Sequence, residues 1–123
     1  VAATGARLIK TLGDEVMFVA EDPEVAVVTA LRLHEVHREG EEVPSLRIGV
    51  AFGEVVTRMG DVYGSTVNLA SRLTALSRPG STLVDDACAE DLASDPRFSL
   101  RALRARPMRG LGLVRAWTVK WGR

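Results

Sequence analysis

The sequence predicts a single α+β domain in which helices cover one face of a sheet. The chain has 123 residues, of which 46% are apolar, enough to bury one core. Short apolar runs bounded by turn residues are typical of strands, and two longer segments have apolar residues at helical spacing. The elements follow in the order ββαββαβαββ, which is an α+β pattern.

The first two strands are expected at residues 7–12 and 15–20. Gly13 and Asp14 lie between them and are typical of a tight hairpin turn, so Asp14 is expected at its tip.

A helix should begin at Asp22, because an aspartate followed by Pro23 and Glu24 supplies an N-cap, a first-turn proline and a favourable charge. It should end at Gly40. Its apolar stripe is Ala26, Ala30 and Leu33.

Residues 45–52 alternate as a strand does, and Gly53 permits a turn into residues 54–59, which predicts a second hairpin. Gly64 and Ser65 break the chain and should cap a second helix ending before Pro79. Its expected stripe is Leu69, Leu73 and Leu76. The remaining elements are a strand at 81–85, a short helix at 86–94, and a final strand pair from 98–105 and 114–121.

Charge excludes a strong general attraction to nucleic acid or anionic membrane, because 16 basic residues balance 16 acidic ones. The C-terminal part is nevertheless suited to an anion, since it has eight cations and no carboxylate. These cations are Arg97, Arg101, Arg104, Arg106, Arg109, Arg115, Lys120 and Arg123.

The compartment is expected to be the cytoplasm, although the intact protein could be tethered to a membrane. Cys88 is the single cysteine and is expected to be a small buried residue. No apolar run is long enough to cross a bilayer, and no signal peptide opens the chain. Because the chain begins at Val1 within a structured pattern, we expect natural sequence upstream of it.

Asn68 and Arg72 are four residues apart on the second helix, so they project together and could hold one polar ligand. Asp61 precedes them, and the helix N-terminus at Ser65 favours an anion nearby. On spacing alone, a solvated edge of an amphipathic helix is the more ordinary interpretation.

Lys10 and Asp14 also have ordinary interpretations. Lys10 is expected on the same strand face as Leu8 and Leu12, where a charge needs an acceptor or an edge position. Asp14 is by default a turn residue.

His34 and His37 have a spacing that could hold a metal, but no third ligand is apparent, so they are interpreted as packing or solvent-edge residues. Trp117 and Trp121 are interpreted as anchors in the core and at the edge of the last strand.

Four stretches together resemble the class III adenylyl and guanylyl cyclase catalytic domain. They are LIKTLGDEVMFVAED, LRIGVAFGEV, DVYGSTVNLASRLTALSRPGSTLV and MRG, and the resemblance extends in order across residues 1–123 as one truncated domain. A weaker similarity to diguanylate cyclases rests on Gly13-Asp14-Glu15, but their motif requires a second glycine where Leu12 stands.

The resemblance implies a ferredoxin-like sheet, with active sites between two domains packed head to tail as a homodimer. It also implies roles for six residues. Asp14 resembles a metal-binding aspartate, Lys10 and Asp61 the pair that reads the purine, Asn68 the ribose-orienting residue, Arg72 the residue on the reacting phosphate, and Arg109 a lysine on the terminal phosphates.

The implied substrate is ATP, because an acid and a lysine complement the amino group and ring nitrogen of adenine, whereas guanine presents the opposite pattern. The implied reaction is attack of the ribose 3′ oxygen on the α-phosphorus, giving 3′,5′-cyclic AMP and pyrophosphate. Two Mg²⁺ or Mn²⁺ ions would take part. Arg109 replaces the family's lysine with a planar cation.

The opening family segment, a strand with the first metal aspartate and two helices, has no counterpart before Val1. We therefore expect an incomplete two-ion site, little or no activity of this chain alone, and an open sheet edge. The alternative is a catalytically silent cyclase-like module that binds nucleotide or a partner for regulation. A third, purely structural interpretation leaves the polar residues solvated.

Overall fold

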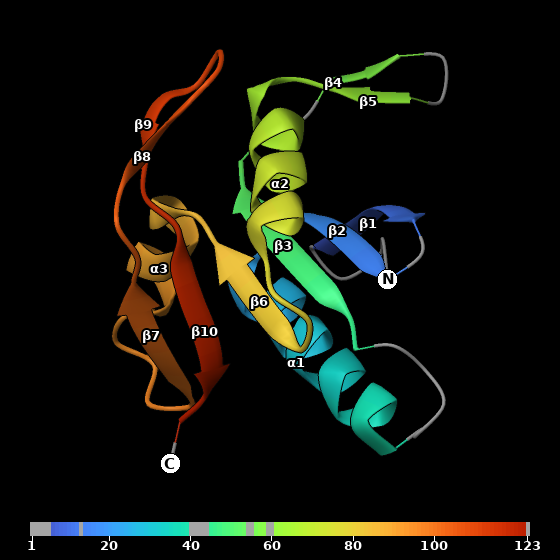
Figure 1. The fold of residues 1–123 in the computed structure, drawn as a ribbon, viewed down its shortest axis with the longest axis vertical. Coiled ribbons are helices and arrows are strands. Elements are labelled where there is room, and N and C mark those ends of the chain that lie inside the picture. The colour runs from blue at the N-terminus through green and yellow to red at the C-terminus, as the bar shows by residue number, and fades with distance from the viewer. Residues whose placement is uncertain (1–5, 13, 40–44, 54–55, 59–60, 123) are drawn as a thin grey trace.

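The computed structural model describes residues 6–12, 14–39, 45–53, 56–58 and 61–122. Its centre is a six-stranded sheet in the order β1-β2-β3-β6-β10-β7 (Figure 1). The elements are β1 (Ala6–Leu12), β2 (Glu15–Ala20), α1 (Pro23–Glu39), β3 (Arg47–Phe52), β4 (Val56–Arg58), β5 (Asp61–Tyr63), α2 (Ser65–Leu76), β6 (Ser81–Val84), α3 (Asp86–Leu92), β7 (Phe98–Ala102), β8 (Arg106–Met108), β9 (Gly112–Val114) and β10 (Trp117–Trp121).

The first hairpin is confirmed, with β1 antiparallel to β2, but it contains an irregularity between Leu8 and Lys10. Leu8 pairs with Phe18, whereas Lys10 pairs with Met17, which belongs to the other face of the sheet. The expectation that Lys10 shares a strand face with Leu8 is therefore wrong at the level of register. A bulge adds one residue to a strand and reverses the alternation of faces beyond it.

Helix α1 begins where the sequence indicates. Asp22 accepts hydrogen bonds from the backbone nitrogens of Glu24 (3.1 Å) and Val25 (3.4 Å), which is the expected N-cap. The helix buries Ala26, Val27, Ala30 and Leu31. It ends at Glu39, next to the predicted stop at Gly40.

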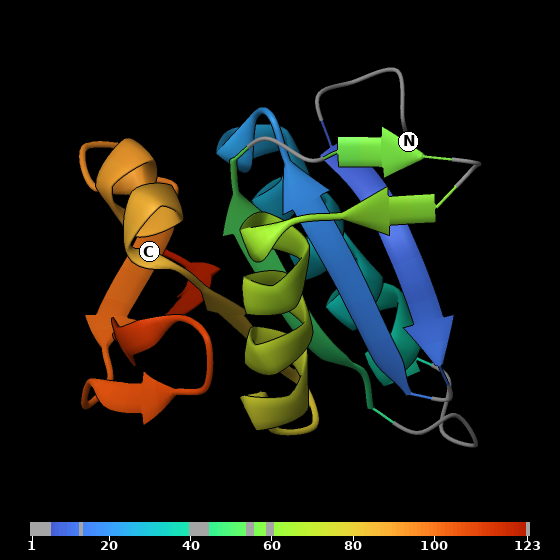
Figure 2. The same cartoon turned by 90° about the horizontal axis from the view of Figure 1, so that it is seen from above.

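Helices cover both faces of the sheet, so the expectation of one covered face is wrong although the α+β class is confirmed. Alternate residues of β2 enter two separate cores: Phe18 packs with α1 and α3, and Val19 packs with α2. Figures 1 and 2 show the strands between α1 and α2. The physical reason is that β3 pairs in parallel with β2 and β6, and parallel strands are generally buried on both sides.

The predicted second hairpin is also wrong. Strand β3 pairs with β2 and β6, and β4, the next described strand, does not pair with it. Instead β4 pairs with β5 in a separate two-stranded sheet that extends away from the central one (Figure 1).

Helix α2 has Gly64 at its N-cap, with φ of 124° and no side-chain cap, so Ser65 is its first residue. Its buried residues are Ala70, Leu73 and Thr74, whereas Leu76 of the predicted stripe is 38% exposed. The side of α2 that packs on the sheet therefore passes through Ala70, Leu73 and Thr74 and does not include all of Leu76.

The predicted final strand pair is confirmed as β7 and β10, which are antiparallel. Between them the chain forms an additional hairpin, β8 with β9, that is separate from the central sheet. The central sheet is continuous through the β2–β3 pairing, and β1 and β7 are its outer strands. No helix in the described ranges is long and apolar enough to cross a membrane.

Candidate functional site

Asn68 and Arg72 lie on the exposed side of α2, one turn apart, as the sequence predicts. The helix is held against the sheet by Leu73, which is fully buried, and by Ala70. In the described part of the chain neither side chain has a hydrogen bond or ion pair to another residue. Both polar groups are therefore available to a ligand.

Asp61 is the first residue of β5, the strand that leads through Gly64 into α2. Lys10 lies in β1 at the outer edge of the sheet. The side chains of both residues lie outside the described part, so their convergence on a purine stays a prediction.

Asp14 directly precedes β2, in the turn that the sequence predicts. Its backbone oxygen accepts a hydrogen bond from the backbone nitrogen of Arg47 (2.8 Å), and its Oδ2 lies 3.6 Å from Nε of the same arginine. The two side chains are 36% and 38% exposed. The guanidinium of Arg47 therefore lies beside the carboxylate that is expected to bind metal.

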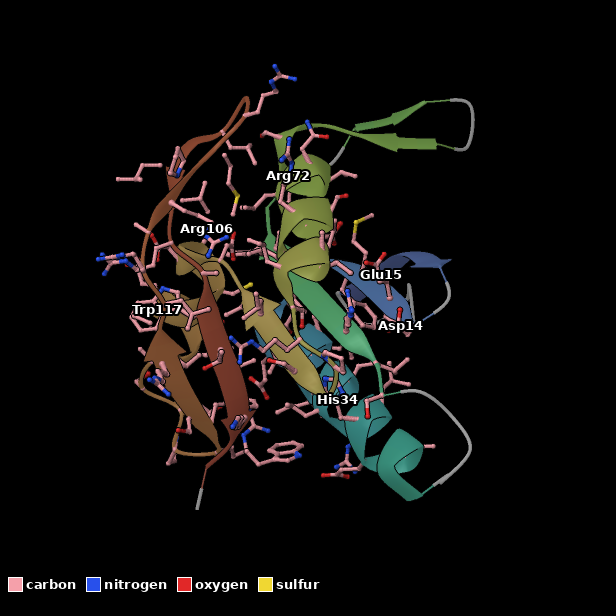
Figure 3. The ribbon with its side chains drawn as sticks, viewed as in Figure 1. Asp14, Glu15, His34, Arg72, Arg106 and Trp117 are labelled. Atoms are coloured by element: carbon pink, nitrogen blue, oxygen red, sulfur yellow. The ribbon has the colours of Figure 1, made fainter. Side chains whose placement is uncertain are left out.

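The chain does not bring Asp14 to Arg72. Asp14 adjoins Arg47, where β3 begins, whereas Arg72 lies on the exposed side of α2, away from the side on which Ala70 and Thr74 contact Gly49. Figure 3 shows Arg72 and Asp14 on different parts of the molecule. Asp14 and Arg72 therefore belong to different parts of the molecule.

Arg109 lies in the turn between β8 and β9 and is exposed. Figure 1 shows this turn at the same end of the molecule as the first turn of α2. The turn that contains Arg109 therefore lies toward the end of the molecule where α2 begins.

The described residues do not by themselves form a metal centre. They contain no group of three or more His, Cys, Asp or Glu side chains that could hold an ion. Asp14 offers one carboxylate, and hard divalent cations generally need several oxygen ligands. Asp14 alone therefore does not fit a two-ion site.

His34, Trp117 and Trp121 have structural roles. His34 is buried, and its Nε2 lies 2.8 Å from the hydroxyl of Thr82. The side chain of His37 lies outside the described residues. Trp117 donates its indole N–H to Asp86 (2.6 Å), and Trp121 stacks on Phe98 with ring centroids 5.8 Å apart.

Two polar residues were missed from the sequence. Arg47 reaches Asp14 only because β2 and β3 pair in parallel, which local patterns do not indicate. Asp85 is 6% exposed and caps α3 by accepting a hydrogen bond from the backbone nitrogen of Cys88 (3.0 Å). Burial raises the pKa of its carboxyl, although hydrogen bonds from Cys88 and Phe52 oppose that effect. An aspartate directly before a short helix was the available signal.

Comparison with known proteins identifies the family of the chain. The profile of the family described as the adenylate and guanylate cyclase catalytic domain matches residues 1–120. An adenylate cyclase of Streptomyces coelicolor is 45% identical over 143 aligned positions, covering 95% of this chain and 38% of that protein. An adenylate cyclase of Streptomyces griseus is 41% identical, covering 95% of this chain and 39% of that protein.

The fold agrees as well. The crystal structure of the adenylyl cyclase CyaB from P. aeruginosa superposes with a TM-score of 0.76 at 20% identity, covering 99% of this chain and 75% of that one. The chain spans less than two fifths of the length of the two Streptomyces relatives. On the extent of the profile match and the identity to these relatives, the chain belongs to the adenylate and guanylate cyclase catalytic domain family.

Proposed function

We propose that this chain is part of an adenylate cyclase that converts ATP to 3′,5′-cyclic AMP and pyrophosphate at an interface between two copies. The observation that carries the proposal is the exposed pair on α2: Asn68 and Arg72 project together from a helix fixed by a buried face. The similarity to proteins named adenylate cyclase supports the same substrate class.

In this proposal Lys10 and Asp61 read the adenine edge, and Asn68 orients the ribose. The 3′ hydroxyl loses its proton to solvent water and its oxygen attacks the α-phosphorus. The bond from that phosphorus to the oxygen bridging the β-phosphate breaks, and pyrophosphate leaves. Arg72 stabilises the negative charge that grows on the phosphoryl oxygens in the transition state. Arg109, on the β8–β9 turn, binds the terminal phosphates through its guanidinium.

Asp14 would offer one oxygen ligand to Mg²⁺ or Mn²⁺, and the other ligands would come from outside the described residues. The ion would neutralise phosphate charge when bound. The separation of Asp14 from Arg72 supports a homodimer in which one copy provides the metal carboxylate and its partner provides α2.

The test uses the full natural polypeptide that contains these residues, with Mn²⁺ and ATP, and measures the initial rate of cyclic AMP formation. Arg72→Ala should lower kcat about 100-fold or more, because it removes a group that stabilises transition-state charge. Arg101→Ala is the matched control, since Arg101 is an exposed arginine on β7 outside the proposed site. Equal rates for Arg72→Ala and the unchanged protein would refute the assignment.

Mixing two inactive variants tests the shared site. Asp14→Ala and Arg72→Ala should each be inactive, and their mixed dimers would contain one intact site of two. Random mixing then restores about a quarter of the activity. No restoration in demonstrably mixed dimers would contradict a site shared between copies. A protein that binds ATP but never turns it over, with every residue intact, would favour the silent regulatory module instead.

A further inference from the structure

A cavity lies apart from Asn68 and Arg72, the exposed pair on α2. Its volume is about 300 Å³, and it lies between the C-terminal end of α2, strand β6 and the β8–β9 hairpin. That volume is at the small end of the range for sites that bind organic ligands, about 300–1,000 Å³. The cavity is therefore large enough for a small organic molecule.

Six of the nine described residues that line this cavity have apolar side chains. Leu83 of β6 and Met108 of β8 are buried, and Leu76 of α2 is 38% exposed at its side. Val114 of β9 also lines the cavity. An apolar ligand group placed here would remove these side chains from water, which is favourable.

The lining of the cavity is also cationic. It contains three exposed arginines, Arg78, Arg104 and Arg106, and no acidic residue is among the described lining residues. None of the three forms an ion pair with a carboxylate in the described part of the chain. Figure 3 shows Arg106 in the space between the β8–β9 hairpin and α2.

Arginines without a neighbouring carboxylate, together with apolar side chains, favour a ligand with two properties. The guanidinium groups form strong, charge-assisted hydrogen bonds with a carboxylate, sulfonate or phosphate. The side chains of the other six described lining residues are apolar and offer no polar partner, so the rest of the ligand should be apolar. A free inorganic anion would interact with the arginines but not with the apolar side chains.

We propose that the cavity between α2, β6 and the β8–β9 hairpin binds a small organic anion with an apolar body. Arg104 and Arg106 hold its acidic group, and Leu83 and Met108 contact its apolar part. This site is separate from the one formed by Asn68 and Arg72, neither of which lines the cavity.

The probe is 8-anilinonaphthalene-1-sulfonate, and N-phenyl-1-naphthylamine is the matched neutral ligand that lacks the sulfonate. Fluorescence titration of the chain should show one saturable site for the anion and at least tenfold weaker binding of the neutral ligand. Charge-assisted hydrogen bonds to guanidinium contribute a factor of about ten each. Equal affinity for the two ligands would overturn the proposal.

The variant Arg104→Gln/Arg106→Gln should weaken binding of the anion at least tenfold and leave the neutral ligand unchanged. Arg101→Gln is the matched control, because it removes an exposed arginine that does not line the cavity. Equal weakening by the control would show a general charge effect and overturn the proposal. Far-UV circular dichroism of each variant confirms that the fold is intact.

Two further measurements keep the site distinct from the proposed nucleotide site and from a loss of folding. Leu76→Trp fills the cavity without removing a charge and should abolish binding of the anion. Arg72→Ala should leave that binding unchanged, whatever it does to cyclase activity. Loss of the probe in Arg72→Ala, or its displacement by ATP, would place the probe in the nucleotide site and overturn the proposal.

Discussion

Gly49 of β3 lies directly beneath Thr74 of α2. A β-carbon added at residue 49 would collide with the backbone nitrogen and hydroxyl of Thr74 and would lie 2.9 Å from the carbonyl oxygen of Ala70. The missing side chain therefore lets the helix lie close to the strand. Because Asn68 and Arg72 are on the same helix, this contact also sets the height of the proposed catalytic pair above the sheet.

Gly49→Ala should lower the free energy of unfolding by about 1–3 kcal/mol, the usual cost of an extra carbon in a packed core. Urea unfolding followed by circular dichroism measures the change. Adding Thr74→Ala should not restore stability, because the backbone nitrogen of residue 74 remains in place. Full rescue by that second change would show that only the hydroxyl was limiting.

Local signals were sufficient to predict the first hairpin, the start of α1 and the α+β class. Gly13-Asp14 indicates a turn and Asp22-Pro23 indicates a cap, and both depend on neighbouring residues only. The bulge before Lys10, the two covered faces and the β4–β5 pair depend on which distant strands lie side by side. Periodicity within one segment does not contain that information.

The candidate site was predictable to a similar extent. The helical spacing of Asn68 and Arg72 correctly places them together on an exposed surface. The neighbour of Asp14 was not predictable, because Arg47 reaches it through a parallel pairing over 33 residues of sequence (47 − 14). Lys10 and Asp61 remain predictions that rest on the family resemblance.

Exchanging the polarity of Lys10 and Asp61 should change the preferred purine. Lys10→Glu/Asp61→Asn offers an acceptor to the ring N–H of guanine and a donor to its carbonyl. The ratio of kcat/KM for ATP to that for GTP should fall at least about tenfold, because mismatched buried polar groups are costly. Initial rates with each nucleotide measure this ratio. An unaltered ratio would refute the assignment of Lys10 and Asp61 to the purine.

Arg47→Met should make the full polypeptide require less Mn²⁺ if Asp14 binds the ion. The guanidinium lies 3.6 Å from the carboxylate and competes with a cation there. Because exposed ion pairs are weak, the Mn²⁺ concentration for half-maximal rate should fall only about two- to fivefold. Arg32→Met, on the exposed side of α1, is the matched control. A higher Mn²⁺ requirement would instead mean that Arg47 orients Asp14.

Cys88 should be nearly inert toward thiol reagents in the native protein. Its side chain is fully buried, and burial together with the charge of nearby Asp85 raises the pKa of the thiol. Reaction with 5,5′-dithiobis(2-nitrobenzoate) at pH 8 should be slow and should become fast and stoichiometric in urea. Rapid native labelling would show that α3 opens frequently.

Asp85 joins α3 to the end of β3. It accepts hydrogen bonds from the backbone nitrogens of Cys88 at 3.0 Å and Phe52 at 3.4 Å. Losing this cap in Asp85→Ala should cost about 0.5–2 kcal/mol of the free energy of unfolding. Asp85→Asn keeps an acceptor oxygen without a buried charge, so it should be as stable as the original at neutral pH or more so.

The pH dependence of these variants should have a definite sign. Burial raises the pKa of Asp85 in the folded state above its ordinary value of 3.8, so in the interval above that value the folded protein binds more protons than the unfolded one. The contribution of this carboxyl to stability therefore decreases as pH rises through the interval. Asp85→Asn cannot titrate, so its advantage over the original protein should be smallest in acid and should grow with pH. Urea unfolding of both proteins across this interval measures the difference. An advantage that shrinks as pH rises would mean that hydrogen bonds to the ionised carboxylate outweigh its burial.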